Sequence, residues 1–453
     1  MNIIITGNGK VGKTLTRQLS GEGHNITVID KDSSVLESSI ENYDVLTVTG
    51  NCASRKVLDA AEIEKTDVVI ATAATDETNL LCCLSARSAN PDVKTIARIR
   101  TPDYVDNIER DRDLYGLSLA INLEKNAAIE MDRLIKFPGV LKRETFIRGR
   151  VEIVELAINE DSPLCDEPLT KISSILRSQV LVCCVLRDGE AIIPGGSFVL
   201  RHGDRIFVTG AIEALSKGLR TLGVVTGKIK KVFIVGGGRV SFYLAHRLVR
   251  NGLDVTIVEK KRERCEELSQ IIPEACIICG DASDMTVLES ERMGSFDAVA
   301  SLTGIDELNI ITSIFATKLG VKNVITKIGR DENRKVVDSL PVGSIVCPKE
   351  LCCSAIVRYI RGMQAGSGAA DSVHFLAEGL VEASEFTIDE TTRHRDTPLR
   401  KIKLKKNTLV ACVRHNGKFV VPDGDSCFSL NDKVIIVSKS SDAVLGFNDI
   451  FAD

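Results

Sequence analysis

The chain has 453 residues, and at about 150 residues per domain this length predicts roughly three domains. Hydrophobic residues make up 44% and charged residues 26%, which is a globular composition and excludes disorder of the whole chain. A formal net charge of −4 and the absence of Trp do not fit the basic excess and stacking rings of a dedicated nucleic-acid binder. No apolar run is long enough for a membrane span, and the N-terminal MNIIITGNGK lacks the pattern of a signal peptide.

The 14 cysteines indicate the compartment in which the protein works. Cys183 and Cys184 lie in the apolar run VLVCCVLR, and Cys276 and Cys279 lie in EACIICGD. Because no export signal is present, we interpret them as small buried hydrophobic side chains in strands rather than as disulfides. A single CxxC without a second pair does not favour zinc, so no metal site is predicted. A reduced, cytoplasmic location is therefore expected.

The sequence repeats itself at a nearly constant offset. MNIIITGNGKVGKTLTRQL resembles KKVFIVGGGRVSFYLAHRL, so that Gly7 and Gly236 lie 229 residues apart, as do Asp30 and Glu259. VTGNCASRKVL pairs with ICGDASDMTVL, and RDGEAIIPGG pairs with HNGKFVVPDG. Chance similarity does not keep one offset over this length, so the chain is a tandem duplication of about 1–222 and 229–453.

Each repeat begins with alternating buried strands and amphipathic helices. In the first repeat NIIIT, ITVID, DVLTVTG, DVVIAT and TIARIR lack clean alternation, which is typical of a parallel sheet covered on both faces. GKTLTRQLSG and DETNLLCCLSARSA are predicted to be intervening helices. The predicted fold class is α/β, with two doubly wound, Rossmann-like parallel-sheet lobes.

Each repeat ends in a small α+β hairpin lobe. VEIVELAI, VLVCCVLRDGEAII and RIFVTG predict strands, and Asp188-Gly189 and Asn416-Gly417 predict tight turns between strands. The chain therefore has four predicted lobes, and Thr221–Lys230 is predicted to link the two repeats. The Rossmann-like lobes are predicted at 1–137 and 229–362, and the small lobes at 138–222 and 369–453.

A helix is expected between the two lobes of each repeat. In the first repeat Ala127, Met131, Leu134 and Ile135 have helical spacing, and the pattern ends near Pro138-Gly139. In the second repeat Pro348 suits the first helical position, and apolar residues follow at Cys352, Ala355, Ile356, Tyr359 and Ile360. Two interpretations stay open: a helix packed on its own lobe, or a crossover helix exchanged between paired lobes.

A glycine-rich loop opens the first repeat as Gly7-Asn8-Gly9-Lys10-Val11-Gly12. It follows a strand and precedes a helix, as a dinucleotide-binding loop requires. The glycines permit a tight turn, close approach of the backbone to a diphosphate, and close helix–strand packing. Asp30, at the end of the second strand, is suited to accept both ribose hydroxyls and to repel a 2′-phosphate, which argues against NADP. A glycine turn without a ligand is the alternative.

Further polar residues follow the later strands of the first lobe. Arg98 and Arg100 lie at the carboxyl end of TIARIR and suggest a phosphate clamp, with exposed ion pairing as the alternative. The small residues Ala73 and Ala74 would let an adenosine ribose lie close. For the motifs Asp76–Asn79 and Asp306–Asn309, helix capping by Thr75 or Asp76 is the favoured interpretation.

The second repeat carries an altered copy, Gly236-Gly237-Gly238-Arg239-Val240-Ser241. Ser241 replaces the third glycine, and Glu259 keeps the acid at the strand end. Lys260, Lys261 and Arg262 follow and weaken the bias against an extra phosphate. Thr303 and Gly304 take the places of the two alanines, Lys327 replaces Arg98 and Gly329 replaces Arg100. A degenerate second site is the alternative.

The first loop also fits a P-loop literally, as Gly7-x₄-Gly12-Lys13-Thr14. The duplicate has Ser241-Phe242-Tyr243 at that place, so this interpretation is rejected. The six histidines form no HxH or HExxH spacing, and no GxSxG is present. No catalytic residue is therefore predicted.

The duplicated pattern GNGKVG, VID, TGN, DETN and ARIR, followed by a hairpin lobe, resembles the TrkA family of Trk potassium-uptake peripheral subunits. DETN at Asp76–Asn79 and ARIRTPDY at Ala97–Tyr104 are its most specific pieces, and each repeat looks like an RCK (KTN) module. The resemblance covers essentially the whole chain. It implies a cytosolic regulator that is not an enzyme and that lies at the inner face of the membrane, with NAD(H) or ATP/ADP as ligand.

The resemblance also implies partners and site residues. The partners are a membrane potassium-translocating subunit of the TrkH/TrkG type and further copies of the chain, in a homotetrameric ring of eight RCK modules. The implied ligand-binding residues are Gly7, Asn8, Gly9, Lys10, Val11, Gly12, Asp30, Ala73, Ala74 and Arg98 in the first site, and Gly236, Gly237, Gly238, Arg239, Val240, Glu259, Thr303, Gly304 and Lys327 in the second. Arg100 joins the first site through its spacing to Arg98. Two other classes of protein stay open: an NAD-dependent oxidoreductase with a duplicated cofactor domain, and a soluble nucleotide sensor without a membrane partner.

Overall fold

The computed structural model describes residues 1–136, 142–146, 151–222, 229–330, 337, 340–364, 370–415, 418–442, 444 and 446–452. The chain divides into two compact units, which are described separately. The first comprises Met1–Ile129 and Cys347–Val357, and the second Glu130–Val346 and Arg358–Asp453. The predicted helix end at Pro138-Gly139, the turn at Asn416-Gly417 and most of the predicted linker lie outside the described residues, and the four predicted lobe boundaries stay predictions.

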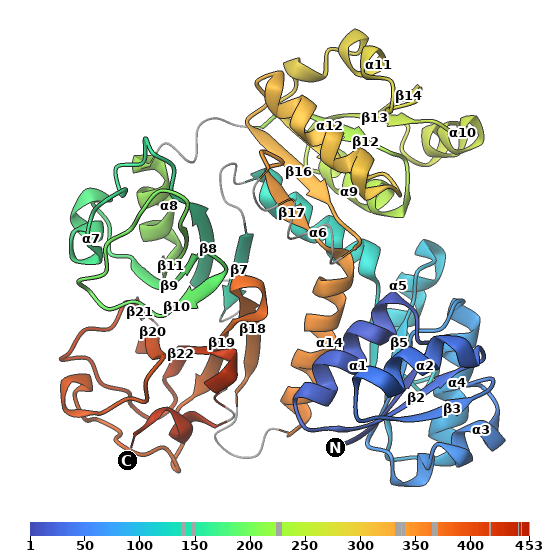
Figure 1. Ribbon diagram of the computed structural model, residues 1–453, viewed down its shortest axis with the longest axis horizontal. Helices are drawn as coiled ribbons and strands as arrows, with labels where there is room; N and C mark the ends of the chain where they lie inside the picture. The colour runs from blue at the N-terminus through green and yellow to red at the C-terminus, as the bar shows by residue number, and fades with distance from the viewer. Residues whose placement is uncertain are drawn as a thin grey trace. The chain divides into compact units, whose positions relative to one another are not determined.

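The first unit contains a six-stranded parallel sheet in the order β3-β2-β1-β4-β5-β6, with helices on both faces (Figure 1). The order reverses between β1 and β4, the point at which doubly wound sheets bind ligands. The predicted doubly wound fold is confirmed. The strands are β1 (Asn2–Thr6), β2 (Asn25–Asp30), β3 (Leu46–Thr49), β4 (Val68–Ala71), β5 (Lys94–Arg98) and β6 (Leu119–Ile121); the helices are α1 (Lys10–Gly21), α2 (Ser33–Asn42), α3 (Arg55–Ala60), η1 (Ile63–Lys65), α4 (Asp76–Ala89) and α5 (Pro102–Arg110).

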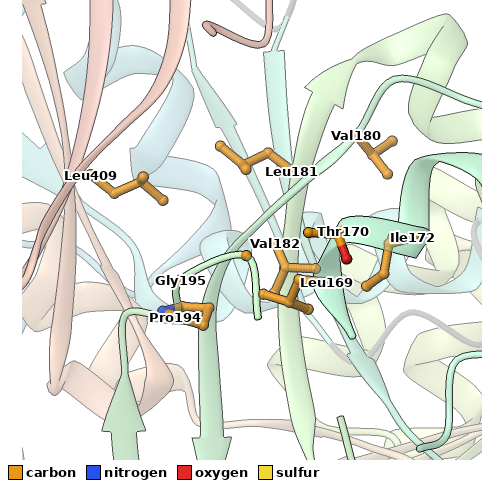
Figure 2. A pocket seen from close by; sticks show the side chains of 10 residues that line it. Leu169, Thr170, Ile172, Val180, Leu181, Val182, Pro194, Gly195 and Leu409 are labelled. Atoms are coloured by element: carbon orange, nitrogen blue, oxygen red, sulfur yellow. The ribbon is translucent and has the colours of Figure 1, made fainter. Parts of the chain in front are cut away.

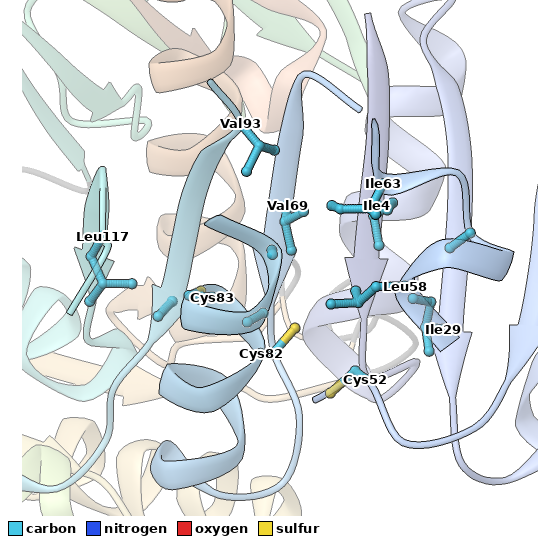
Figure 3. Packing of buried hydrophobic residues seen from close by; sticks show 14 of the residues in the cluster. Ile4, Ile29, Cys52, Leu58, Ile63, Val69, Cys82, Cys83, Val93 and Leu117 are labelled. Carbon is cyan, nitrogen blue, oxygen red and sulfur yellow. The ribbon is translucent and has the colours of Figure 1, made fainter. Parts of the chain in front are cut away.

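The central strand β1 explains why this sheet forms. Ile3, Ile4 and Ile5 are all buried, because helices cover both faces of the strand. Ile4 pairs in register with Val69 of β4, and both lie in the core that α4 covers (Figure 3). Five strands of this sheet match the predicted ones, whereas β6 has only three residues and left no periodic signal in the sequence.

The second unit contains the equivalent sheet in the order β14-β13-β12-β15-β16-β17. The two sheets have the same strand order, as the 229-residue repeat predicts. The strands are β12 (Lys231–Val235), β13 (Asp254–Glu259), β14 (Cys276–Cys279), β15 (Ala298–Ser301), β16 (Asn323–Lys327) and β17 (Ser344–Val346); the helices are α9 (Arg239–Arg250), α10 (Arg262–Ile271), α11 (Met285–Ser290), η3 (Met293–Ser295) and α12 (Asp306–Lys318).

Two five-stranded antiparallel sheets complete the second unit, in the orders β10-β9-β11-β8-β7 and β18-β19-β22-β20-β21. Positive φ angles of 53° at Asp188 and 78° at Gly189 confirm the predicted turn between β9 and β10. The two sheets share one core, in which Phe146 and Phe207 join Leu376 and Cys412. The elements are β7 (Lys142–Phe146), β8 (Val151–Ala157), η2 (Leu169–Lys171), α7 (Ile172–Ile175), β9 (Leu181–Arg187), β10 (Glu190–Ile192), β11 (Arg205–Ala211), α8 (Ile212–Thr221), β18 (Ser372–Leu376), η4 (Ala377–Gly379), β19 (Val381–Thr387), η5 (Leu399–Lys401), β20 (Thr408–His415), β21 (Lys418–Val420), β22 (Lys433–Lys439), η6 (Ser440–Asp442) and η7 (Phe447–Ile450).

Helices α6 (Leu123–Lys136) and α14 (Pro348–Gln364) are exchanged between the repeats, which decides between the two interpretations above. The last part of α6 packs on the second Rossmann-like lobe, where Asp132 Oδ2 lies 3.0 Å from Arg247 Nη2. Conversely, Cys353 of α14 approaches the carbonyl of Val11 in α1, at 3.9 Å. The predicted apolar stripe of α14 is partly wrong: Cys353 and Val357 are buried, whereas Ala355 and Tyr359 are only half-buried. The buried residues in the part of α14 that belongs to the first unit are Cys352, Cys353, Ile356 and Val357.

The cysteine prediction holds only in part. Cys183 and Cys184 are buried in β9, as expected. Cys276 and Cys279 are exposed, so the prediction for this pair is wrong. Their strand, β14, is the edge of its sheet, and an edge strand leaves part of an apolar run open to solvent.

Among the described residues, no helix combines the length and the apolar character needed to cross a bilayer.

Candidate functional site

The glycine loop of the first lobe leaves one face of its backbone open. Gly7 has a φ of +86°, and a Cβ there would lie 2.7 Å from the backbone N of Ala73. A Cβ on Gly12 would collide with the carbonyl oxygen of Gly7. Gly9, in contrast, has no atom within 4 Å of the position of a Cβ. The outer two glycines are therefore required for packing, and the middle one leaves space for a group that approaches the backbone.

At the N-terminus of α1, the helix that follows the loop, no acidic side chain balances the positive end of the helix dipole. Gly9 is the N-cap of α1, no side chain caps it, and no acid stands in the first turn. The first helical residue is the exposed Lys10, although a helix N-terminus favours negative charge. By comparison, α4 begins with a Thr75 cap and with Asp76 and Glu77. Amide donors and a lysine at one helix end are suited to an anion.

The second lobe has the same arrangement. Gly236 has a φ of +96°, Gly238 has no atom within 4 Å of the position of a Cβ, and Gly238 is the uncapped N-cap of α9. The exposed Arg239 takes the place of Lys10, again without an acid in the first turn. Val240 and its counterpart Val11 are buried, so only the backbone of these two predicted site residues is available to a ligand.

An acidic side chain at the end of the second strand lies against each loop. Asp30 accepts a hydrogen bond from the backbone N–H of Asn8 at 2.6 Å, and Glu259 accepts one from Gly237 at 2.7 Å. The other carboxylate oxygens accept the N–H groups of Asp32 and Lys261. Each carboxylate is thus held beside the open loop, with lone pairs left to accept hydroxyl groups.

The predicted site residue Asn8 has a different geometry from its neighbours. Its side chain is buried and donates to the carbonyl of Val35 at 2.5 Å and to Ser39 Oγ at 2.9 Å. These contacts tie the loop to α2. In the second lobe Gly237 stands at this position, and a Cβ there would lie 2.7 Å from Leu268 Cδ1. The side-chain contacts that Asn8 makes in the first lobe therefore have no counterpart at Gly237 in the second.

Small residues border both loops, and a buried asparagine holds them in place. Ala73 and Thr303 donate their backbone N–H groups to Asn79 Oδ1 and Asn309 Oδ1, at 2.7 and 2.8 Å. The amide nitrogens of these asparagines donate to the carbonyls of Arg98 and Lys327, each at 2.9 Å. Ala74 and Gly304, the next residues, are exposed. The asparagine thus joins the ends of two neighbouring strands beside the glycine loop.

The acid of the same motif makes a second tie. Asp76 accepts from the backbone N–H groups of Arg100 and Thr101, and Asp306 accepts from those of Gly329 and Arg330, all within 3.0 Å. Capping by Thr75 is confirmed, since its Oγ1 accepts from the N–H of Thr78. Capping is nevertheless an incomplete account of the motif, because the acid and the asparagine both connect to the end of the next strand. The repetition of the motif at a 230-residue offset was the sequence signal for this role.

The side chains of Arg98 and Glu124 are largely buried, so this ion pair is not an exposed one. Its Nη2 lies 3.4 Å from Glu124 Oε1, its Nε has no hydrogen-bond partner, and Glu124 Oε2 has none either. Burial is the main cause that lowers the pKa of the Arg98 guanidinium below its ordinary value, against the neighbouring Glu124 carboxylate that raises it. Glu124, at the start of α6, was not singled out in the sequence. The pair is a charged contact with hydrogen-bonding capacity left over.

Arg100 and Lys327 lie beside the loops in other ways. Strand β5 ends at Arg98, so strand alternation does not extend to Arg100. The Arg100 guanidinium lies 3.4 Å from the carbonyl of Ala73 and 3.7 Å from Asp76 Oδ1. Lys327 Nζ donates to the carbonyl of Leu302 at 3.1 Å. Each lobe therefore places at least one cation near the small residues that border its loop.

Two residues of the second lobe distinguish its loop from the first. Ser241, which replaces the third glycine, is fully buried, and its hydroxyl has no hydrogen-bond partner. Arg264 of α10 donates from Nε to the carbonyl of Gly237 at 2.7 Å. Sequence reasoning missed Arg264, whose counterpart by repeat offset is Val35. The only signal was the basic character of residues 260–264.

A pocket in the second unit is lined by apolar and small residues, among them Leu169, Val180 and Leu409 (Figure 2). None of its lining residues is charged. In the described part of the chain no group of three or more His, Cys, Asp or Glu residues is placed to hold a metal ion.

Comparison with known proteins places this architecture in a family. The TrkA-N domain model matches residues 3–121 and 232–348, and the TrkA-C domain model matches 153–223. The Trk system potassium uptake protein TrkA homolog of Archaeoglobus fulgidus is 30% identical over 442 residues, covering 97% of each chain. The chain belongs to the TrkA family.

Two further relatives extend this result. The Trk system potassium uptake protein TrkA homolog 1 of Methanosarcina mazei is 29% identical over 450 residues and 98% of each chain. The structure titled GsuK channel bound to NAD has a TM-score of 0.63 and 15% identity, and covers 97% of this chain and 77% of that one. At this identity the likeness concerns the fold alone. The family resemblance noted in the sequence is confirmed.

Proposed function

We propose that this TrkA-family chain is a nucleotide-binding regulatory subunit of a membrane potassium-uptake transporter and is not an enzyme. The observation that carries the proposal is the pair of uncapped helix N-termini, each led by a basic residue and each facing a strand-end carboxylate. A diphosphate at the helix end and a ribose at the carboxylate satisfy both groups at once. The relatives are named as potassium uptake proteins, and the GsuK channel is described as bound to NAD.

The ligand class we propose is NAD(H) or an adenine nucleotide, ATP or ADP. Asp30 and Glu259 accept ribose hydroxyls, which NAD(H), ATP and ADP all carry. Arg98, Arg100 and Lys327 supply cations for the remaining phosphates. The proposed site residues are those predicted from the sequence. Asn8 serves through its backbone, because its side chain is occupied by Val35 and Ser39.

We further propose that the chain assembles as a homotetrameric ring of eight modules on the inner face of the membrane, with a potassium-translocating partner of the TrkH/TrkG type. Exposed apolar side chains at equivalent positions of the two repeats support this assembly. Leu81 of α4 is 54% exposed, and Ile311 of α12 is 53% exposed. A side chain of this kind on both repeats suits a contact that recurs around a ring.

The test is a titration of the purified chain with NAD⁺, NADH, ADP and ATP, followed by potassium uptake in cells that express it with the membrane partner. We expect two bound nucleotides per chain, co-purification with the membrane subunit, and a transport rate that changes with the nucleotide. Absence of nucleotide binding would contradict the regulatory proposal. Steady turnover of NADH with a panel of carbonyl substrates would support the oxidoreductase, and binding without co-purification would support the soluble sensor.

A further inference from the structure

The second Rossmann-like lobe holds a pair of neighbouring thiols beside its glycine loop. Cys265, on α10, is buried, and its thiol lies 3.3 Å from the carbonyl oxygen of Glu259. Across the parallel strands β13 and β14, the residue in register with Glu259 is Cys279. Cys265 therefore contacts the backbone of the residue that lies directly beside Cys279 in the sheet. The two cysteines are adjacent at the end of the edge strand.

The two thiols differ in their access to solvent. Cys279 ends the edge strand β14 and is exposed, whereas Cys265 lies beneath it. Burial raises the pKa of the Cys265 thiol to about 11. An oxidant in solution therefore meets Cys279 first, and Cys265 is the thiol in place to react with the product.

The pair is connected to the nucleotide-binding elements by direct contacts. Arg264, the residue before Cys265, holds the carbonyl of Gly237 in the glycine loop. The Glu259 carbonyl that Cys265 contacts belongs to the residue whose side chain binds the Gly237 N–H. The first lobe has Leu36 and Thr49 at the equivalent positions, so this pair is a feature of the second lobe.

We propose that Cys265 and Cys279 form a reversible disulfide that weakens nucleotide binding at the second site. With hydrogen peroxide as oxidant, the Cys279 sulfur attacks the peroxide, an S–O bond forms, the O–O bond breaks and water leaves, giving a sulfenic acid. The Cys265 sulfur then attacks that sulfur, the S–S bond forms, the S–O bond breaks, and a second water leaves with the proton of Cys265. A dithiol reductant reverses the change.

The geometry shows why this bond would affect the site. A disulfide has a length of about 2.05 Å, so the two sulfurs must approach to well within the distance of a non-bonded contact. The N-terminal part of α10 is drawn toward the end of β14, and with it Arg264 shifts from the Gly237 carbonyl. The thiol donor to the Glu259 carbonyl is also lost. The effect on binding rests on the nucleotide-binding function proposed above, whereas the disulfide itself does not.

The first experiment is a peptide map of the full-length chain after treatment with hydrogen peroxide, without reduction. We expect a Cys265–Cys279 cross-linked peptide that is absent in Cys265→Ser and in Cys279→Ser. Cys276→Ser is the matched control, because Cys276 is exposed on the same strand three residues away, and this variant keeps the cross-link. A map in which Cys279 pairs with another cysteine, or remains reduced, overturns the proposal.

The second experiment measures the affinity for NADH and ATP before oxidation, after oxidation and after dithiothreitol. It uses the Lys10→Glu background, in which the added acid weakens the first site. We expect oxidation to weaken the second site by about fivefold or more, the loss expected for one hydrogen bond, and reduction to restore it. An unchanged affinity in fully cross-linked protein overturns the regulatory role. If the reduced chain binds neither nucleotide, the proposed function fails, while the peptide map still decides the disulfide.

Discussion

Reversing the charge of the first residue of a glycine-loop helix should change nucleotide affinity and folding stability in opposite directions. Lys10 and Arg239 are exposed and begin α1 and α9, where the helix dipole disfavours a cation. We expect Lys10→Glu to stabilise the free lobe, because an acid suits this end of a helix. The same change should weaken nucleotide binding at that site, because the acid repels the diphosphate.

The magnitudes follow from the exposure of the side chain. Two unit charges about 4 Å apart interact by about 1 kcal/mol in a water-like environment, so a reversal costs about 2 kcal/mol, or roughly thirtyfold in affinity. The helix end should gain about 1 kcal/mol in free energy of unfolding, because an unfavourable charge is replaced by a favourable one. Arg239→Glu should act in the same way on the second site.

The assay combines calorimetric titration with NADH and ATP and chemical denaturation without nucleotide. Lys217→Glu is the control for net charge, since Lys217 is exposed on α8 in a small lobe. It should leave both nucleotide sites unchanged. The reasoning is refuted if Lys10→Glu leaves the affinity unchanged, or if affinity and stability fall together, since a damaged fold would then explain the loss.

Three further sets of substitutions test the site and the assembly. Asn79→Ala should lower the free energy of unfolding by about 2–4 kcal/mol, because it leaves the backbone N–H of Ala73 and the carbonyl of Arg98 without partners. The control Asn25→Ala, at the exposed contact with Asn2, should lower it by less than about 1 kcal/mol. Equal losses for the two variants in urea denaturation would contradict this prediction. Gly7→Ala should prevent folding of the first lobe, because a Cβ there meets backbone atoms. Gly9→Ala should change the free energy of unfolding by less than about 1 kcal/mol but weaken NADH binding at least about tenfold. A Gly7→Ala protein that is stably folded by circular dichroism would refute the packing argument. The double variant Leu81→Asp, Ile311→Asp should reduce the number of chains per particle measured by light scattering. Ile271→Asp is the control, because Ile271 is also exposed but has no apolar counterpart in the first repeat, and it should leave that number unchanged. If the double variant keeps the same number of chains, Leu81 and Ile311 do not lie in the interface.

The features that the sequence predicted are those encoded by local pattern. Buried β-branched runs such as NIIIT predict strands, and the 229-residue offset transfers each assignment to the second repeat. The Asp188-Gly189 turn follows from the ability of these residues to adopt positive φ. The glycine loop and the strand-end acids are also local signals, and the structure places them together. Their role in binding is still a prediction.

The features that the sequence did not predict depend on contacts distant in the chain. The acceptor of Arg264 is a backbone carbonyl 27 residues earlier, and no spacing rule specifies such a contact. Arginine is usually exposed, but Arg98 is buried against Glu124 at the start of α6. Cys276 and Cys279 resemble core residues, but their exposure depends on β14 having no strand beyond it.

The helix exchange supplies a physical reason for keeping two modules in one chain. The first part of α14 belongs to the first unit, where the Cys353 Sγ lies 3.9 Å from the carbonyl oxygen of Val11 in the glycine loop. Farther along the same helix, Arg361 forms an ion pair with Glu382 of the second small lobe at 2.7 Å. Residues of one helix therefore contact the proposed first nucleotide site in the first unit and a small lobe in the second unit. A ligand that prefers one position of this helix changes it only by the difference in its affinity for the two positions. Because duplication keeps both modules in one chain, such an effect does not depend on protein concentration.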